Sequence, residues 1–165
     1  MRYAQIRKMD ITNGTGIGVS LFTQGCPYRC KGCFNPETWD FNGGKEWNKD
    51  VEDYFLSLLN NDFVQRITFL GGEPLIENNL EDLKKLLIKI KEFHPNIEIW
   101  CYSGNTFENM SEKQLDVLKY VDVLVDGPFI FTLKDLTLKY RGSSNQRIID
   151  VQQTLTQNKI VLKEC

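Results

Sequence analysis

The chain has 165 residues, the length of one compact domain that can bury a core without disulfides. Its net charge of −2 and its ordinary composition, 41% hydrophobic and 25% charged, give no electrostatic reason to expect binding to nucleic acid or an anionic membrane. No basic N-terminus leads into an apolar segment, and no apolar run is long enough to span a bilayer. We therefore expect a cytoplasmic protein with one domain, residues 1–165.

Two predicted strands and a helix lie in the first half of the chain. Gly18–Thr23 mixes apolar and β-branched residues, which is typical of a short strand. Apolar residues repeat at helical spacing over residues 51–59, and Asn48 precedes them as the N-cap. Arg66–Leu70 is the second strand, which the turn Gly71–Pro74 ends.

The clearest helix of the sequence follows that turn. Apolar residues repeat at helical spacing from Leu80 to Phe93, and His94 before Pro95 ends the helix. Ile97–Tyr102 reads as the third strand and leads into the turn Ser103–Asn105.

A third helix and a fourth strand complete the predicted core. Ser111 and Gln114 have the spacing of a capping box, which predicts that a helix begins after Ser111. Val123–Asp126 is the fourth strand, and Gly127 and Pro128 stop it. From about Leu133 the pattern weakens, and the tail to residue 165 is either a last hairpin or an extended segment.

Strands and helices therefore alternate, and the strands are apolar runs. This order predicts an α/β fold with a mostly parallel sheet covered by helices. Right-handed crossovers place the C-terminal ends of parallel strands at one edge. Four strands are too few for a closed eight-stranded barrel, so we predict an open or partial barrel. The loops after the strands should meet at that edge, where ligands bind in such folds.

Three of the five cysteines, Cys26, Cys30 and Cys33, fall within eight residues of the first of these loops. An odd number of clustered cysteines is not the pattern of a disulfide framework, and in a reducing compartment it favours metal binding or redox chemistry. The alternatives are a zinc site, an electron-carrier ferredoxin, or three cysteines that only pack in the interior. Zinc and ferredoxin sites each need a fourth ligand.

No nearby residue supplies that fourth ligand. The only histidine, His94, lies at the end of a distant helix. Cys101 and Cys165 could in principle add a thiolate, but we predict that Cys101 is a buried strand residue and Cys165 a thiol of the frayed tail. Three thiolates suit a 4Fe–4S cube, because they leave one iron open for a substrate, as an open position does in catalytic zinc sites.

At this point the motifs resemble those of a known superfamily. C-x3-C-x2-C is the signature of the radical S-adenosylmethionine (SAM) superfamily, and Gly71-Gly72-Glu73-Pro74 resembles its second motif, a glycine-rich turn after the second strand. Glycines let backbone carbonyls approach an ammonium group, Glu73 adds negative charge, and Pro74 restricts the turn. The resemblance implies a partial, open β/α barrel of the radical SAM type.

Within that superfamily, the chain is similar over nearly its whole length to the family that activates anaerobic (class III) ribonucleoside-triphosphate reductases. The similar segments are D-I-T-N-G-x-G at Asp10–Gly16, C-F-N-P-E-T-W at Cys33–Trp39, V-L-V-D-G-P-F at Val123–Phe129 and R-G-S-S-N-Q-R at Arg141–Arg147. The superfamily usually has an aromatic residue before its third cysteine. Here Gly32 holds that position and Phe34 follows the cysteine, an arrangement typical of this family.

The resemblance implies a role for each site residue. The three cysteines would each ligate one iron of a 4Fe–4S cluster, and the amino and carboxylate groups of SAM would chelate the fourth. Gly32 and Phe34 would line the adenosyl side, and Asp126 would contact the cofactor. The methionine amino group would be held by the turn Gly71, Gly72, Glu73 and Pro74.

The resemblance also implies the reaction and the partners. The reduced cluster would cleave SAM to a 5′-deoxyadenosyl radical, which would take hydrogen from a backbone glycine of the reductase and leave a glycyl radical. This chemistry requires no side-chain acid, base or nucleophile. Reduced flavodoxin or a similar protein would donate the electron, and neither nucleic acid nor a membrane is an expected partner.

Several alternatives stay open. The chain could activate another glycyl-radical enzyme, act on a small molecule, or be a non-catalytic iron–sulfur or metal-binding protein. The segment Arg141–Arg147 is either a docking or closing segment for the reductase or a surface turn. The aromatic residues Trp39, Phe41 and Trp47 either shield the cluster from water or pack as a small satellite core.

Overall fold

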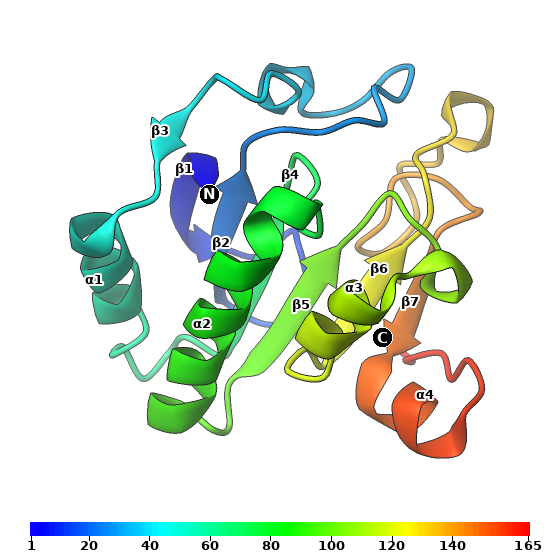
Figure 1. Cartoon of the computed structure of the whole chain (residues 1–165). Coiled ribbons are helices and arrows are strands. Elements are labelled where there is room, and N and C mark those ends of the chain that lie inside the picture. Colours follow the sequence, from blue (N-terminus) through cyan, green and yellow to red (C-terminus); the bar gives the residue numbers. More distant parts are fainter.

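The computed structural model describes all residues, Met1–Cys165. One seven-stranded sheet in the order β3-β1-β2-β4-β5-β6-β7 forms its centre (Figure 1). The strands are β1 Arg2–Asp10, β2 Gly18–Thr23, β3 Lys45–Glu46, β4 Arg66–Gly71, β5 Glu98–Tyr102, β6 Val123–Asp126 and β7 Arg147–Asp150. The α-helices are α1 Lys49–Leu58, α2 Glu77–Phe93, α3 Glu112–Leu118 and α4 Val151–Gln157, and short 3₁₀ turns are η1 Pro36–Thr38, η2 Phe107–Asn109 and η3 Phe131–Leu133.

The four predicted strands form the parallel centre of the sheet. β2 pairs with β4, β4 with β5, and β5 with β6, all in parallel. Every residue of β2 and of β6 is buried, as expected for strands covered on both faces. The predicted α/β class and parallel core are confirmed.

Antiparallel strands flank this centre. β1 pairs antiparallel with β2 and with β3 on one side, and β7 pairs antiparallel with β6 on the other. These pairings were not predicted, and they make the sheet mixed. The sheet does not close on itself, because β3 and β7 are its two edges.

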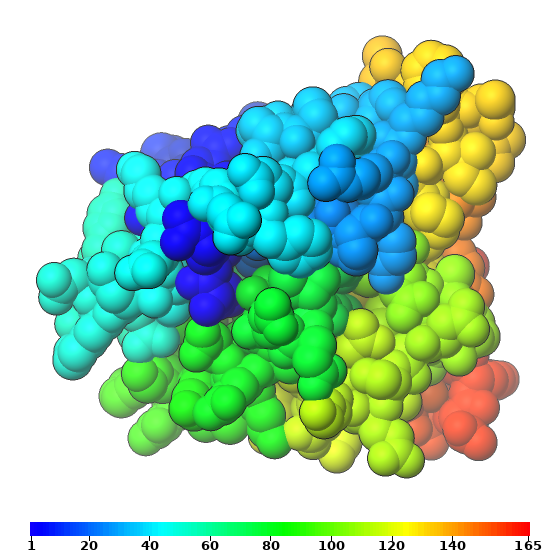
Figure 2. Space-filling model, turned by 45° about the horizontal axis from the view of Figure 1, so that its top comes forward, coloured from blue at the N-terminus to red at the C-terminus, as the bar shows by residue number.

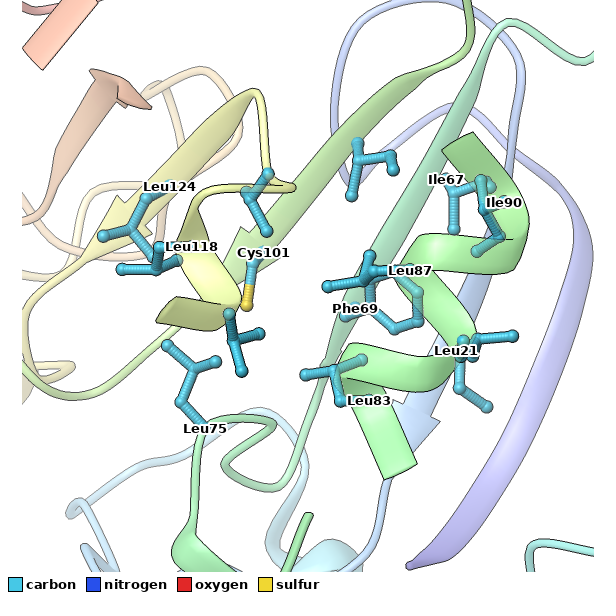
Figure 3. Close-up of a cluster of buried hydrophobic side chains, with 14 of the residues drawn as sticks. Leu21, Ile67, Phe69, Leu75, Leu83, Leu87, Ile90, Cys101, Leu118 and Leu124 are labelled. Atoms are coloured by element: carbon cyan, nitrogen blue, oxygen red, sulfur yellow. The ribbon is translucent and has the colours of Figure 1, made fainter. Parts of the chain in front are cut away.

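The helices α1, α2 and α3 cover one face of the sheet, and the main core lies between them and the strands (Figures 1 and 3). Leu21, Phe69 and Cys101 point from the sheet into this core, where Leu83 and Leu87 of α2 meet them (Figure 3). Cys101 is 1% exposed, so the prediction of a buried strand cysteine is confirmed. No helix of the structure combines the length and the hydropathy that a membrane crossing requires.

The predicted helix caps are present. The Asn48 side chain accepts a hydrogen bond from the Val51 N–H at the start of α1, and α2 ends at Phe93 before His94. Ser111 and Gln114 form the complete capping box of α3. The predicted apolar face of α1 is only partly buried, since Tyr54 is 41% exposed.

The tail from Leu133 contains more regular structure than a hairpin or an extended segment. Its strand β7 returns beside β6, and α4 follows directly, with the Asp150 side chain accepting from the Gln153 N–H. Because β7 is only four residues long, its pattern is too short to distinguish a strand from a loop in the sequence.

The other face of the sheet carries a buried arginine. Arg66 is 0% exposed, and its guanidinium donates hydrogen bonds to the carbonyl oxygens of Asp10 (2.5 Å), Asn13 (3.1 Å) and Thr15 (3.0 Å). A Cβ on Gly14 would lie 2.4 Å from Cδ of Arg66. The D-I-T-N-G-x-G segment therefore wraps this side chain, which gives the motif a structural role.

The carboxylate of Asp10 orders the same loop and predicts an effect of pH. Burial raises its pKa, but hydrogen bonds from Ser20, Asn13 and Thr12 outweigh burial and lower the pKa from 3.8 to about 2. As pH falls, the Asp10 carboxylate therefore binds a proton in the unfolded chain before it does so in the folded protein. The free energy of unfolding decreases as pH falls from 3.8 towards 2. We expect urea midpoints to fall less steeply over this range in Asp10→Asn than in wild type. Asp62→Asn, which changes an exposed carboxylate, should keep the wild-type slope.

Candidate iron–sulfur and cofactor site

The four loops that follow the parallel strands meet at one edge of the sheet, as predicted. A chain of hydrogen bonds connects them in order. The Glu73 N–H donates to the Gly25 carbonyl (2.9 Å), the Gly104 N–H donates to Glu73 Oε2 (2.7 Å), and the Gly127 N–H donates to the Asn105 carbonyl (3.0 Å). The cysteine loop, residues 24–35, is thus tied to the turns after β4, β5 and β6.

The cysteine loop holds three free thiols near the surface. Cys26, Cys30 and Cys33 are all partly buried, and none forms a disulfide. The Cys33 N–H donates to the Cys30 carbonyl (3.1 Å), and Arg29 has a left-handed backbone with φ of 47°. These turns make the loop compact at the C-terminal ends of the parallel strands.

A backbone N–H group points at one of the three sulfurs. The Asn35 N–H donates to Sγ of Cys33 (3.4 Å). The backbone N–H groups of Tyr28 and Arg29 act to lower the pKa of the Cys26 thiol. Burial still raises the pKa of the Cys26 thiol, and the negative charge of Glu73 acts in the same direction. A cation beside the Cys26 sulfur, such as an iron, would favour its thiolate form.

The donor set fits an iron–sulfur cluster. No group of three or more His, Cys, Asp or Glu side chains converges closely enough to hold a single metal ion. A cube does not require such convergence, because each thiolate meets a different iron. A backbone N–H···S hydrogen bond like the one at Cys33 is among the contacts that set the potential of such clusters.

The turn Gly71–Pro74 lies against the base of the cysteine loop. The Gly72 N–H donates to the Thr23 carbonyl (2.9 Å), and a Cβ on Gly72 would lie 2.4 Å from the Gly25 carbonyl oxygen. Gly71 has a φ of 105° and similarly close backbone neighbours. Gly72 is therefore required for the close approach of the turn to the cysteine loop, and Gly71 for its close approach to the end of β2, roles that the sequence did not reveal.

The side chain of Glu73 points into the protein. It is 3% exposed, and its carboxylate accepts from the N–H groups of Leu75 (3.1 Å) and Gly104 (2.7 Å). Burial raises its pKa to about 7, while these N–H groups and the Ser103 side chain oppose the rise. Glu73 therefore joins the turns after β4 and β5. Pro74 beside it is also buried.

Asp126 is engaged by protein groups. It is 1% exposed, and its carboxylate accepts from the Phe107 N–H (2.8 Å) and from Nε (3.0 Å) and Nη2 (2.5 Å) of Arg147. Arg147 also binds Glu108 through both of its terminal nitrogens. Asp126 is thus the last residue of β6, and its carboxylate also links β6 to β7.

Gly32 and Phe34 contact the segment that follows β6, which we call the strap, residues 129–142. A Cβ on Gly32, which has a φ of 75°, would lie 2.5 Å from the Phe131 ring. The Phe34 ring packs against Phe129 with a centroid distance of 5.1 Å. In Figure 2 the light-blue cysteine loop lies beside the yellow strap.

A cavity of about 570 Å³ extends from the cysteine loop over the face of the sheet that has no helices. Phe34 and Asn35 form one end, Phe22, Leu70 and Tyr102 of the sheet form the floor, and the strap forms a wall. Phe34 is 54% exposed, so the cavity opens to solvent beside the cysteines. The strap wall could not be predicted from the sequence, because its residues have no regular period.

The segment Arg141–Arg147 forms an ordered connection and includes part of the cavity wall. The Asn145 side chain donates to the Pro128 carbonyl (2.8 Å), and the Gln146 side chain donates to the Gly127 carbonyl (3.1 Å). Ser143 is fully buried. These bonds attach the segment that follows the strap to the turn after β6.

The three aromatic residues after the cysteines lie in different environments. Trp47 packs against Tyr3 and Phe55, so it extends the main core. Phe41 covers Gly25 at the base of the cysteine loop, and the Arg29 guanidinium lies 5.8 Å from the centre of the Trp39 ring. Only Trp39 and Phe41 lie beside the cysteine loop.

Comparisons with known proteins agree with this geometry. Residues 12–149 match the family described as a 4Fe-4S single cluster domain. This match covers most of the chain and gives its class, a protein domain that carries one 4Fe–4S cluster.

Curated relatives share one description, anaerobic ribonucleoside-triphosphate reductase-activating protein. The protein of Escherichia coli (strain K12) is 39% identical over 148 residues, which are 88% of this chain and 96% of that protein. The protein of Enterobacteria phage T4 is 38% identical over 90% of this chain and 93% of its own length. That of Vibrio cholerae is 36% identical over 90% and 97%. The chain belongs to the family of anaerobic ribonucleoside-triphosphate reductase-activating proteins.

Proposed function

We propose that this protein is a radical SAM enzyme that activates an anaerobic ribonucleoside-triphosphate reductase by generating a glycyl radical on it. The observation that carries the proposal is the loop of three partly buried thiols, with the Asn35 N–H group aimed at the Cys33 sulfur, in a chain of this family. When bound, a 4Fe–4S cluster and SAM supply the radical chemistry: reductive cleavage gives a 5′-deoxyadenosyl radical, which takes hydrogen from a glycine.

Different residues at the C-terminal ends of the parallel strands would bind the cluster and SAM. Cys26, Cys30 and Cys33 would hold the cluster through three irons, which leaves the fourth for SAM. The turn of Gly71 and Gly72 would receive the methionine amino group, because it lies against the cysteine loop and has no side chains in the way.

Other predicted residues would act at the borders of this site. Glu73 would add negative charge from a buried position, and Pro74 would restrict the turn that carries it. Gly32 and Phe34 would line the adenosyl side, since Phe34 borders the cavity. Asp126 would hold the turn after β6 in place beside the cofactor, because its carboxylate is already bound by Arg147.

The cavity beside Phe34 would admit the glycine-bearing segment of the reductase. Its floor is the face of the sheet that has no helices and its wall is the strap, so a peptide in extended form could lie along it. An opening to solvent suits a protein substrate better than a small molecule, which enzymes usually enclose. The sheet would curve around this cavity as in the partial barrels of radical SAM proteins.

The remaining parts of the proposal concern the setting of the reaction. The chain would act as a single domain in the cytoplasm, and reduced flavodoxin or a similar protein would supply the electron. The protein's own contribution would be to bind, orient and shield the reacting groups from water, without a side-chain acid or base.

Anaerobic reconstitution tests this function. The wild-type protein, loaded with iron and sulfide and then given dithionite and SAM, is expected to release 5′-deoxyadenosine and methionine. Addition of the purified reductase should give the doublet of a glycyl radical in electron paramagnetic resonance. If no 5′-deoxyadenosine forms, the protein is not a radical SAM enzyme. If cleavage occurs but the reductase gains no radical, its target is a different protein.

A further inference from the structure

The strap exposes an unusual number of apolar side chains. Ile130, Phe131, Leu133 and Leu136 are 37%, 48%, 40% and 79% exposed, so four large hydrophobic residues face solvent within seven positions. Phe34 of the neighbouring cysteine loop extends the same surface. Contiguous exposed apolar groups of this kind mark interaction sites on globular proteins.

The strap is ordered although it has no long helix or strand. The Ser144 N–H donates to the Leu133 carbonyl (3.0 Å), and the Asp135 N–H donates to the Gly142 carbonyl (3.1 Å). The Tyr102 hydroxyl donates to the Tyr140 carbonyl (2.6 Å) and attaches the strap to β5. The apolar side chains are thus presented on a firm support, which lowers the entropic cost of binding a partner.

The cations of this surface have no carboxylate partner within the protein, and the Arg141 guanidinium donates only to the Gln146 carbonyl (2.6 Å). Lys134, Lys139 and Arg141 of the strap and Lys31 of the cysteine loop form no ion pair, whereas every lysine of α1, α2 and α3 does. Lys134 and Lys31 lie over the rings of Phe34 and Phe131 at 5.5 and 5.4 Å.

The acids of the strap do not neutralise these cations. Asp135 is its only acidic residue, and hydrogen bonds from the N–H and hydroxyl of Thr137 engage the Asp135 carboxylate. The strap surface is therefore apolar and positively charged in a chain whose net charge is −2. A partner complementary to it would present apolar side chains beside carboxylates.

We propose that the strap, with Leu133 and Lys139 among its contacts, is the docking surface for the reductase, which meets it with an apolar and acidic face. This inference rests on the proposed function. Because the strap is also a wall of the cavity, a segment that enters the cavity places the body from which it extends over the strap. A second copy of this chain fits less well, since a two-fold contact would oppose the same cations.

Binding of the purified reductase, measured by sedimentation without SAM or reductant, tests this surface. We expect Leu133→Asp and Lys139→Glu each to raise the Kd for the reductase by about tenfold or more, as substitutions at interface hot spots do. Matched changes elsewhere, Ile88→Asp at an isoleucine of α2 that is 41% exposed and Lys159→Glu at a lysine without an ion pair, should leave the Kd within about twofold.

The outcomes separate this proposal from the proposed function. The Kd of wild type should rise with salt, and less steeply for Lys139→Glu. Wild-type affinity in both strap variants would overturn the proposal, as would an equal loss in the matched controls. So would a change in the self-association of the chain, or slower reduction by flavodoxin with unchanged affinity for the reductase. Failure of the proposed function would instead appear as absent 5′-deoxyadenosine in wild type.

Discussion

Replacement of Cys26, Cys30 or Cys33 by alanine is expected to abolish cluster assembly and reduce glycyl-radical formation to background. Each thiolate would hold its own iron, and no other cysteine can take its place. Cys101 points into the core below the helices, and Cys165 is exposed in the segment after α4. Iron and sulfide content after anaerobic reconstitution, together with visible absorbance, measures the loss directly.

Two further cysteine variants are the controls for this result. Cys165→Ala should retain the full cluster. Cys101→Ala should retain it as well, at a cost of about 1 kcal/mol in stability for the lost sulfur in the core. Full iron content in any variant of the loop cysteines would contradict the ligand assignment, and so would loss of the cluster in Cys101→Ala.

Gly72→Ala is expected to lower SAM cleavage at least about a hundredfold while the protein still folds, because misplacement by about 1 Å is enough for such a loss. The backbone of Gly72 is not in the left-handed region, so alanine brings no conformational strain there. Its Cβ would instead meet the Gly25 carbonyl oxygen at 2.4 Å. That carbonyl cannot move freely, since it accepts from the Glu73 N–H. The turn must therefore move away from the cysteine loop.

The rate of 5′-deoxyadenosine release, the SAM affinity and the iron content measure this effect separately. Gly43→Ala is the matched control, because its Cβ would meet the end of the Gln24 side chain at 2.6 Å and would lie no closer than 3.4 Å to the nearest backbone atom, the Asp40 carbonyl oxygen. It should cleave SAM at close to the wild-type rate. Wild-type cleavage in Gly72→Ala would show that the close approach of the two loops is not needed for cofactor binding.

The parallel centre of the fold could be predicted because its signals are local. β2, β4, β5 and β6 are short apolar runs, and the amphipathic pattern of α2 spans several turns with a clear stop at His94. The capping box at Ser111 is a contact between residues three apart, so the sequence contains all of it. From these elements the convergence of four loops at one edge follows by chain topology alone.

The flanking strands could not be predicted in the same way. β1 carries exposed and half-buried residues without strict alternation, and its pairing with β2 contains irregularities in register. β7 becomes a strand because β6 offers it an unpaired edge. Such strands depend on partners that are distant in sequence, which a local pattern does not describe.

The sequence alone determined the three-cysteine loop, its place after a strand, and the glycine turn one β/α unit later, because spacing and strand order are local properties. The tertiary structure decided how these parts meet. In the folded protein the Glu73 carboxylate points inward, Gly72 packs closely against the cysteine loop, and Asp126 binds Arg147. It also brought the strap beside the cysteines. These contacts join residues that are far apart in the chain, so only packing in three dimensions specifies them.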